Sequence, residues 1–153
     1  MSLGLRILNI PILNVTTSVC LMALWIKYFA VVIMDNKYSS QSNDSPKVDD
    51  EKLVTESNNN DSKRFWFITL NDIENIPMTL LMYFAAYLST LADNNGQMAL
   101  IVLLPIYTFS RMVHSWAFAK ANLLLRGAAH FICLGCTIAF GLMSVIQNIR
   151  YYK

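Results

Sequence analysis

The chain has 153 residues, of which 55% are hydrophobic and only 14% are charged, whereas about a quarter of the residues of an ordinary soluble domain are charged. This composition predicts a protein whose surface faces an apolar solvent. The net charge of +2 and the scattered basic residues exclude a nucleic-acid partner. The three cysteines lie within apolar segments, which argues against a secreted disulfide framework.

Four stretches of the chain have the length and composition of membrane helices, which need about 20 mainly apolar residues each. The first covers residues 10–34; it is too long for a signal peptide and has no small-residue cleavage site, so we expect it to be retained. Residues 35–63 are mostly Asn, Ser, Asp, Lys and Glu, a composition typical of a solvated loop. The remaining helices are predicted over residues 65–91, 97–118 and 123–148, with a tight turn at 92–96. The sequence therefore predicts an all-α integral membrane protein, a single four-helix transmembrane bundle over residues 1–153.

Basic residues near the helix ends predict the orientation, because Lys and Arg favour the cytoplasmic side. The loop before the second helix and the connection before the fourth carry most of them: Lys37, Lys47, Lys52, Lys63, Arg64, Lys120 and Arg126. Arg6, Arg150 and Lys153 lie on the other side. We therefore expect both termini to face the lumen.

Ionisable side chains within membrane segments are candidate functional residues, because each costs about 2.5 to 3.5 kcal/mol on insertion scales. The following polar residues are expected in the cytoplasmic half of the bundle: Lys27, Arg64, Asn71, Glu74, Arg111, His114 and Arg126. Helical periodicity places Arg64, Asn71 and Glu74 on one face of the second helix. It likewise places Arg111 and His114 together on the third helix. Such a cluster suits an anionic hydrophilic ligand, since Asn and Glu bind amide and ammonium groups while Arg binds carboxylates or a thiolate.

Simpler roles exist for some of these residues. Glu74 and Arg111 would form a buried pair in which each charge offsets the insertion cost of the other. Lys27 and Arg126 lie near helix ends, from which long side chains commonly extend to the membrane interface.

The fourth predicted helix also contains His130, Cys133 and Cys136, whose spacing is that of metal ligands or of a C-x-x-C redox pair. The sequence offers no fourth ligand nearby. Small residues along this helix, such as Gly135 and Gly141, favour close helix packing instead. We therefore expect no metal site.

The segment Leu70–Pro77, with the sequence LNDIENIP, resembles the signature of the membrane-associated proteins in eicosanoid and glutathione metabolism (MAPEG). Lys27 followed by YFAVVI, and RMVH at 111–114 followed by SWAF, match the patterns of that family in the same order. The chain looks most similar to the microsomal glutathione transferases. The resemblance implies a homotrimer in the endoplasmic reticulum membrane, or alternatively the mitochondrial outer membrane, with glutathione bound in a cytosol-facing pocket between subunits.

The resemblance also implies roles for individual residues. Asn71 and Glu74 would hold the glutathione backbone, and His114 would line the site. Arg111 would support the site through polar contacts. Arg126 would be the catalytic residue that stabilises the glutathione thiolate.

Some positions depart from the family pattern. Phe67 and Phe118 stand where the family commonly has an arginine and a tyrosine. The spacing from Phe118 to Arg126 is also one residue short. Arg64 is a candidate replacement for the missing arginine, and Lys27 is a further candidate for binding glutathione.

The activity that the resemblance implies is enzymatic. Glutathione would be a co-substrate, activated as its thiolate and either conjugated to a lipophilic electrophile or used to reduce a lipid hydroperoxide, with membrane lipid around the site. One alternative is a glutathione-dependent prostaglandin E synthase. Another is a non-catalytic lipid-binding or scaffold member of the family, which the phenylalanines at positions 67 and 118 favour.

Overall fold

A computed structural model describes residues 3–39, 61–91 and 93–151 of the chain, and these form an all-α bundle. Its helices are α1 (Leu3–Ser39), α3 (Asp61–Thr90), α4 (Asn94–Ala119) and α5 (Leu123–Tyr151). The described residues contain no strand. The predicted all-α, four-helix fold is confirmed.

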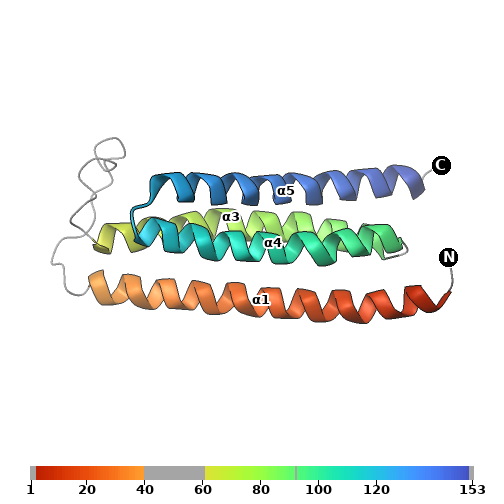
Figure 1. Cartoon of the computed structure of the whole chain (residues 1–153), viewed down its shortest axis with the longest axis horizontal. Coiled ribbons are helices and arrows are strands. Elements are labelled where there is room, and N and C mark those ends of the chain that lie inside the picture. The colour runs from red at the N-terminus through yellow and green to blue at the C-terminus, as the bar shows by residue number, and fades with distance from the viewer. Residues whose placement is uncertain (1–2, 40–60, 92, 152–153) are drawn as a thin grey trace.

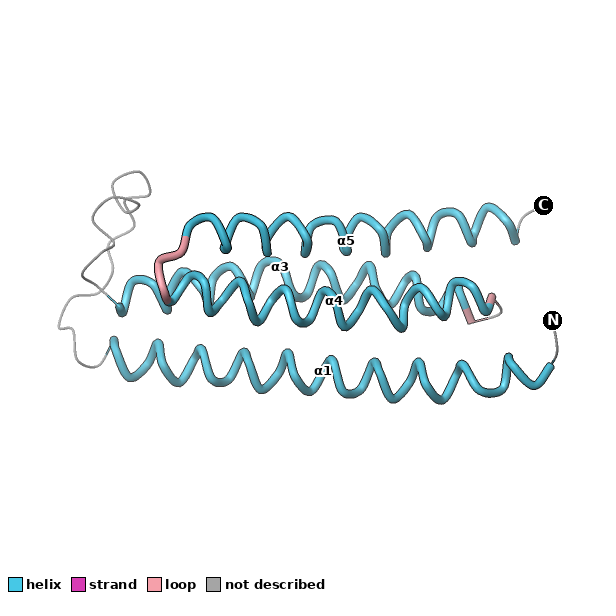
Figure 2. The backbone as a smooth tube through the Cα atoms, in the orientation of Figure 1, coloured by secondary structure: helices cyan, strands magenta, loops and turns pink. Residues whose placement is uncertain are grey.

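The helices run alternately up and down along one axis, with α3 and α4 lying between α1 and α5 (Figure 1). The start of α1 and the end of α5 therefore lie at the same end of the bundle (Figure 2). This arrangement is the one that an even number of membrane crossings requires.

The helices extend into the segment predicted as a loop. Helix α1 continues to Ser39 and α3 begins at Asp61, so the predicted bounds 35–63 were too wide, and residues 40–60 of that loop lie outside the described part. The helices are longer than their apolar stretches for a physical reason. An apolar stretch is needed only where the helix contacts lipid. Backbone hydrogen bonds of the helix can continue into polar residues beyond that point.

The outside of the bundle is apolar, as a membrane protein requires. Helices α1, α4 and α5 contain stretches long and apolar enough to cross a membrane, and large side chains such as Trp25, Phe109 and Phe131 point outward. Helix α3 has 30 residues, or about 45 Å of helix, which exceeds the hydrocarbon thickness of a bilayer. Its composition is more polar because it carries Asp72 and Glu74.

Tyr and Thr hydroxyls inside the bundle are bonded across helices. Tyr83 is fully buried and its hydroxyl is hydrogen-bonded to Thr17 of α1. Thr79 of α3 and Thr137 of α5 are hydrogen-bonded at 2.8 Å. These bonds satisfy polar groups that lipid could not, and they tie α3 to both outer helices.

The connection between α3 and α4 is short and closely packed. Asp93 caps α4, and its carboxylate accepts hydrogen bonds from the backbone nitrogens of Asn95, at 3.3 Å, and Gly96, at 3.1 Å. The side chain of Gln147, from α5, also donates to Asp93. Residues 94–96 of the predicted turn thus form the first turn of α4 instead.

Gly96 leaves no room for a side chain. A Cβ atom there would lie 2.5 Å from Cγ2 and 2.8 Å from Cβ of Thr90, which is itself fully buried. We expect Gly96→Ala to lower the free energy of unfolding by about 1 to 3 kcal/mol, the usual cost of overpacking. Unfolding in detergent by chemical denaturant measures it, with the exposed neighbour Asn95→Ala as control. Equal stability of the two variants would contradict the close approach to Thr90.

Candidate functional site

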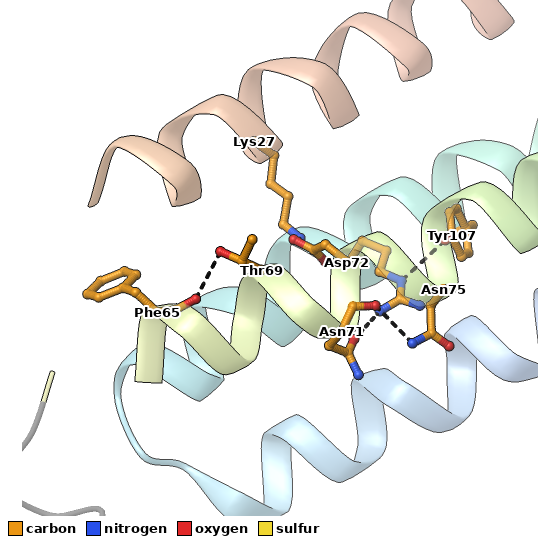
Figure 3. A network of polar contacts seen from close by, with 8 residues as sticks. Lys27, Phe65, Thr69, Asn71, Asp72, Asn75 and Tyr107 are labelled. Carbon is orange, nitrogen blue, oxygen red and sulfur yellow. Dashed lines mark hydrogen bonds and ion pairs between the residues drawn. The ribbon is translucent and has the colours of Figure 1, made fainter. Parts of the chain in front are cut away.

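The polar residues of the bundle gather where the end of α1, the start of α3 and the end of α4 meet. Lys27 of α1 forms an ion pair with Asp72 of α3, and both are buried, with exposed fractions of 8% and 1% (Figure 3). Lys27 therefore does not extend to the membrane interface. Asp72 was not among the predicted site residues, because the sequence does not show which acidic residue of the second helix faces α1.

Arg111 is held by neutral partners inside the bundle. Its side chain is 2% exposed; Nη1 donates to Oδ1 of Asn71 at 2.7 Å, and Nε donates to the hydroxyl of Tyr107 at 3.2 Å. Asn71 is also fixed through its backbone oxygen, which accepts from Nδ2 of Asn75 at 2.9 Å (Figure 3). The predicted polar faces of α3 and α4 thus meet at Asn71 and Arg111.

Glu74 lies elsewhere on α3. Its side chain is exposed, whereas Arg111 is bonded to Asn71 and Tyr107, so the alternative of a buried Glu74–Arg111 pair is wrong. Glu74 is three positions after Asn71, which is a rotation about 60° short of a full helical turn. That difference is enough to place one inside the bundle and the other on its surface.

Side chains of α4 and α5 form a second group beside this cluster, here called the α4/α5 ring: His114, Phe118, Arg126 and His130. The guanidinium carbon of Arg126 lies 4.8 Å from the centroid of the Phe118 ring. The centroid of His114 lies 6.3 Å from that of Phe118 and 6.0 Å from that of His130. Arg126 is half-buried against α4 and does not extend away from it.

The connection between α4 and α5 accounts for this position of Arg126. Ala121 adopts a left-handed backbone conformation with φ of 55°, which lets the chain reverse within residues 120–122. The side chain of Asn122 then accepts a hydrogen bond from the backbone nitrogen of Leu125 at 3.1 Å. The shortened spacing from Phe118 is thereby accommodated in the turn, and Arg126 still faces Phe118.

Several buried polar atoms of this region have no hydrogen-bond partner among the described residues: Oδ1 of Asp72, Nδ1 of His114 and Oγ of Ser115. Buried polar atoms in proteins are nearly always bonded to protein, water or ligand. A polar ligand or water at this end of the bundle would satisfy them.

The remaining candidates are less informative. Arg64 is in α3, but its side chain lies outside the described part. Cys133 and Cys136 are buried free thiols. Among the described residues, no three His, Cys, Asp or Glu side chains converge as metal ligands would. From the sequence, His130 was considered only as a metal ligand or as part of a redox motif. The sequence feature that indicates a role in the site is its position one helical turn after Arg126.

The sequence profile of the MAPEG family matches residues 15–146, which cover α3 and α4 completely and most of α1 and α5. A search of curated proteins finds no match. The matched range contains Lys27, Asn71, Arg111, His114 and Arg126. An apolar four-helix bundle with these residues at one end thus agrees with the profile, and the chain belongs to the MAPEG family.

Proposed function

We propose that this chain is a glutathione-dependent membrane transferase, which conjugates glutathione to lipophilic electrophiles or uses it to reduce lipid hydroperoxides. Membership of the MAPEG family supports a glutathione-related function in a membrane. The observation that carries the finer proposal is the buried positive charge of Arg111, whose hydrogen-bond partners among the described residues, Asn71 and Tyr107, are both neutral. A buried cation of this kind favours an anionic ligand, and glutathione is an anionic peptide.

Each chemical group of glutathione would have a suitable partner at this end of the bundle. Arg111 already occupies Oδ1 of Asn71, so the amide nitrogen of Asn71 is the group available to donate to a peptide oxygen. The carboxylate of Glu74 would accept from the ammonium group. Arg126 would lie beside the thiol and stabilise it as the thiolate. The apolar helix surfaces would bring the lipophilic substrate to the site from the membrane.

Glu74 also supports a homotrimer with glutathione between subunits. Its carboxylate is exposed on the single chain, next to the exposed apolar side chain of Ile73. A carboxylate facing lipid is costly, and a neighbouring subunit with bound glutathione would cover it. We place the site on the cytosolic face of the endoplasmic reticulum, since Lys37, Lys120 and Arg126 lie near the helix ends on that side and such residues favour the cytoplasm.

Glutathione binding to the purified protein in detergent tests the proposal. We expect calorimetric titration to show binding, and Glu74→Gln to weaken it about tenfold, because a hydrogen bond to a charged group contributes about 1.5 to 3 kcal/mol. Asn95→Ala, at the opposite end of the bundle, should bind as the wild type does (Figure 1). Mass measurement on the same sample should give three chains per particle.

A wild-type protein that binds no glutathione would overturn the proposed function. It would favour the non-catalytic, lipid-binding alternative. A monomer that still binds glutathione would refute only the site between subunits.

A further inference from the structure

We infer that His130 is the proton donor to an oxygen leaving group, and that the site therefore favours lipid hydroperoxides over electrophiles that release a halide. This inference rests on the proposed function and goes further by naming the substrate class. It assigns chemistry to a residue that the family-based assignments above leave without a role.

The geometry of the α4/α5 ring carries the inference. His130 is four positions after Arg126 on α5, so their side chains project from the same face of the helix, one turn apart. His114 and Phe118 have the same spacing on α4 and face them, at the centroid distances given above. A thiolate held by Arg126 would thus lie within one helical turn of an imidazole.

The two histidines differ in their access to a ligand. His114 is 4% exposed and its Nδ1 has no hydrogen-bond partner among the described residues, whereas His130 is half-buried. His130 can therefore contact a substrate directly. His114 is the more buried of the two histidines. Its Nδ1 atom would bind a water or a ligand that lies among the residues of the α4/α5 ring.

Three charged groups from different helices lie close enough to act on His114: Arg126 of α5, Arg111 of α4 and Lys27 of α1. Lys27 is itself paired with Asp72 of α3. Arginine keeps its charge at all relevant pH values. An imidazole can both accept and donate a proton, and His130 is the more accessible of the two, which makes it the proton-transferring group of the cluster.

The proposed reaction uses one proton twice. His130 first takes the proton of the glutathione thiol, leaving the thiolate beside Arg126. The thiolate then attacks the terminal oxygen of the hydroperoxide; the S–O bond forms, the O–O bond breaks, and the departing alkoxide takes the proton from the His130 imidazolium to become an alcohol. A second glutathione reduces the resulting sulfenic acid to glutathione disulfide and water. Glutathione is oxidised and the hydroperoxide is reduced, with all atoms accounted for.

An aryl halide makes a different demand on the site. Its chloride leaves as a stable anion and needs no proton, so only the thiolate is required. Comparison of the two substrate types therefore separates proton donation from thiolate formation and from glutathione binding.

The experiment compares kcat/KM for cumene hydroperoxide and for 1-chloro-2,4-dinitrobenzene in the wild type and in His130→Gln. We expect the hydroperoxide value to fall at least about thirtyfold more than the chlorodinitrobenzene value, since a general acid contributes about 10²- to 10⁴-fold. Asn148→Ala, an exposed position near the end of α5, should leave the ratio unchanged.

Equal losses for both substrates would overturn the inference, because His130 would then act in binding or folding. A wild type that binds glutathione and conjugates the aryl halide but reduces no hydroperoxide would overturn it too, while the proposed function would stand. If His130→Gln fails to fold, the wild-type rates in H₂O and in D₂O are compared instead. Donation of a proton to the leaving group predicts that D₂O slows hydroperoxide turnover more than conjugation. Equal slowing of the two reactions would contradict the inference.

Discussion

Arg126→Ala should slow glutathione turnover at least tenfold while weakening glutathione binding less. A free thiol has a pKa near 8.5, and lowering that of bound glutathione by about two units requires roughly 2.7 kcal/mol of preferential stabilisation of the thiolate. One guanidinium in a partly water-excluded site can supply this. The guanidinium carbon of Arg126 lies 4.8 Å from the centroid of the Phe118 ring, and this contact would hold the guanidinium where the sulfur is proposed to bind.

The measurement is the ultraviolet absorbance of the thiolate, recorded alongside turnover and binding. Binding should persist because Asn71 and Glu74 would still contact the peptide. Arg150→Ala removes the same side chain from an exposed position at the other end of α5, and it should change nothing. If Arg126→Ala left both the thiolate signal and turnover intact, Arg126 would have no role in activating the thiol.

Asp72→Leu should have the largest effect on stability. The substitution leaves the charge of Lys27 buried without its partner, and breaking a buried ion pair in this way costs about 3 to 5 kcal/mol. Replacing both residues, as Lys27→Met with Asp72→Leu, should recover most of that loss, because apolar side chains of similar size fit a buried site without a desolvation cost.

Equilibrium unfolding in detergent without glutathione measures these changes. Glu74→Gln is the matched control, because Glu74 is an exposed acidic residue on the same helix. Its unfolding free energy should differ little from that of the wild type. A single Asp72→Leu variant as stable as the wild type would show that the pair does not hold α1 against α3.

The ion pair also bears on the proposed ligand binding. Asp72 neutralises Lys27, while the contacts of Arg111 are with the neutral side chains of Asn71 and Tyr107. These described residues of the cluster therefore keep a net positive charge. That charge would attract an anionic peptide without the insertion cost of a second unpaired residue.

The membrane class, the number of helices and the end of the bundle at which polar residues gather could all be predicted from the sequence. These properties depend on local composition and on helical periodicity, which each segment carries independently of its neighbours. The turn after the second helix was also visible from its residue types, although its last residues belong to α4.

The partners of the polar residues could not be predicted in this way, because they depend on how the helices pack. Lys27 could be assigned no partner from the sequence, and it is Asp72 that faces it; Glu74, two positions further on, is exposed. A rotation of α3 about its own axis would exchange these environments without changing a single residue. Packing against α1 and α4 fixes that rotation, and the reversal at Ala121 turns Arg126 toward Phe118, because contacts between helices depend on relative orientations that no single segment specifies.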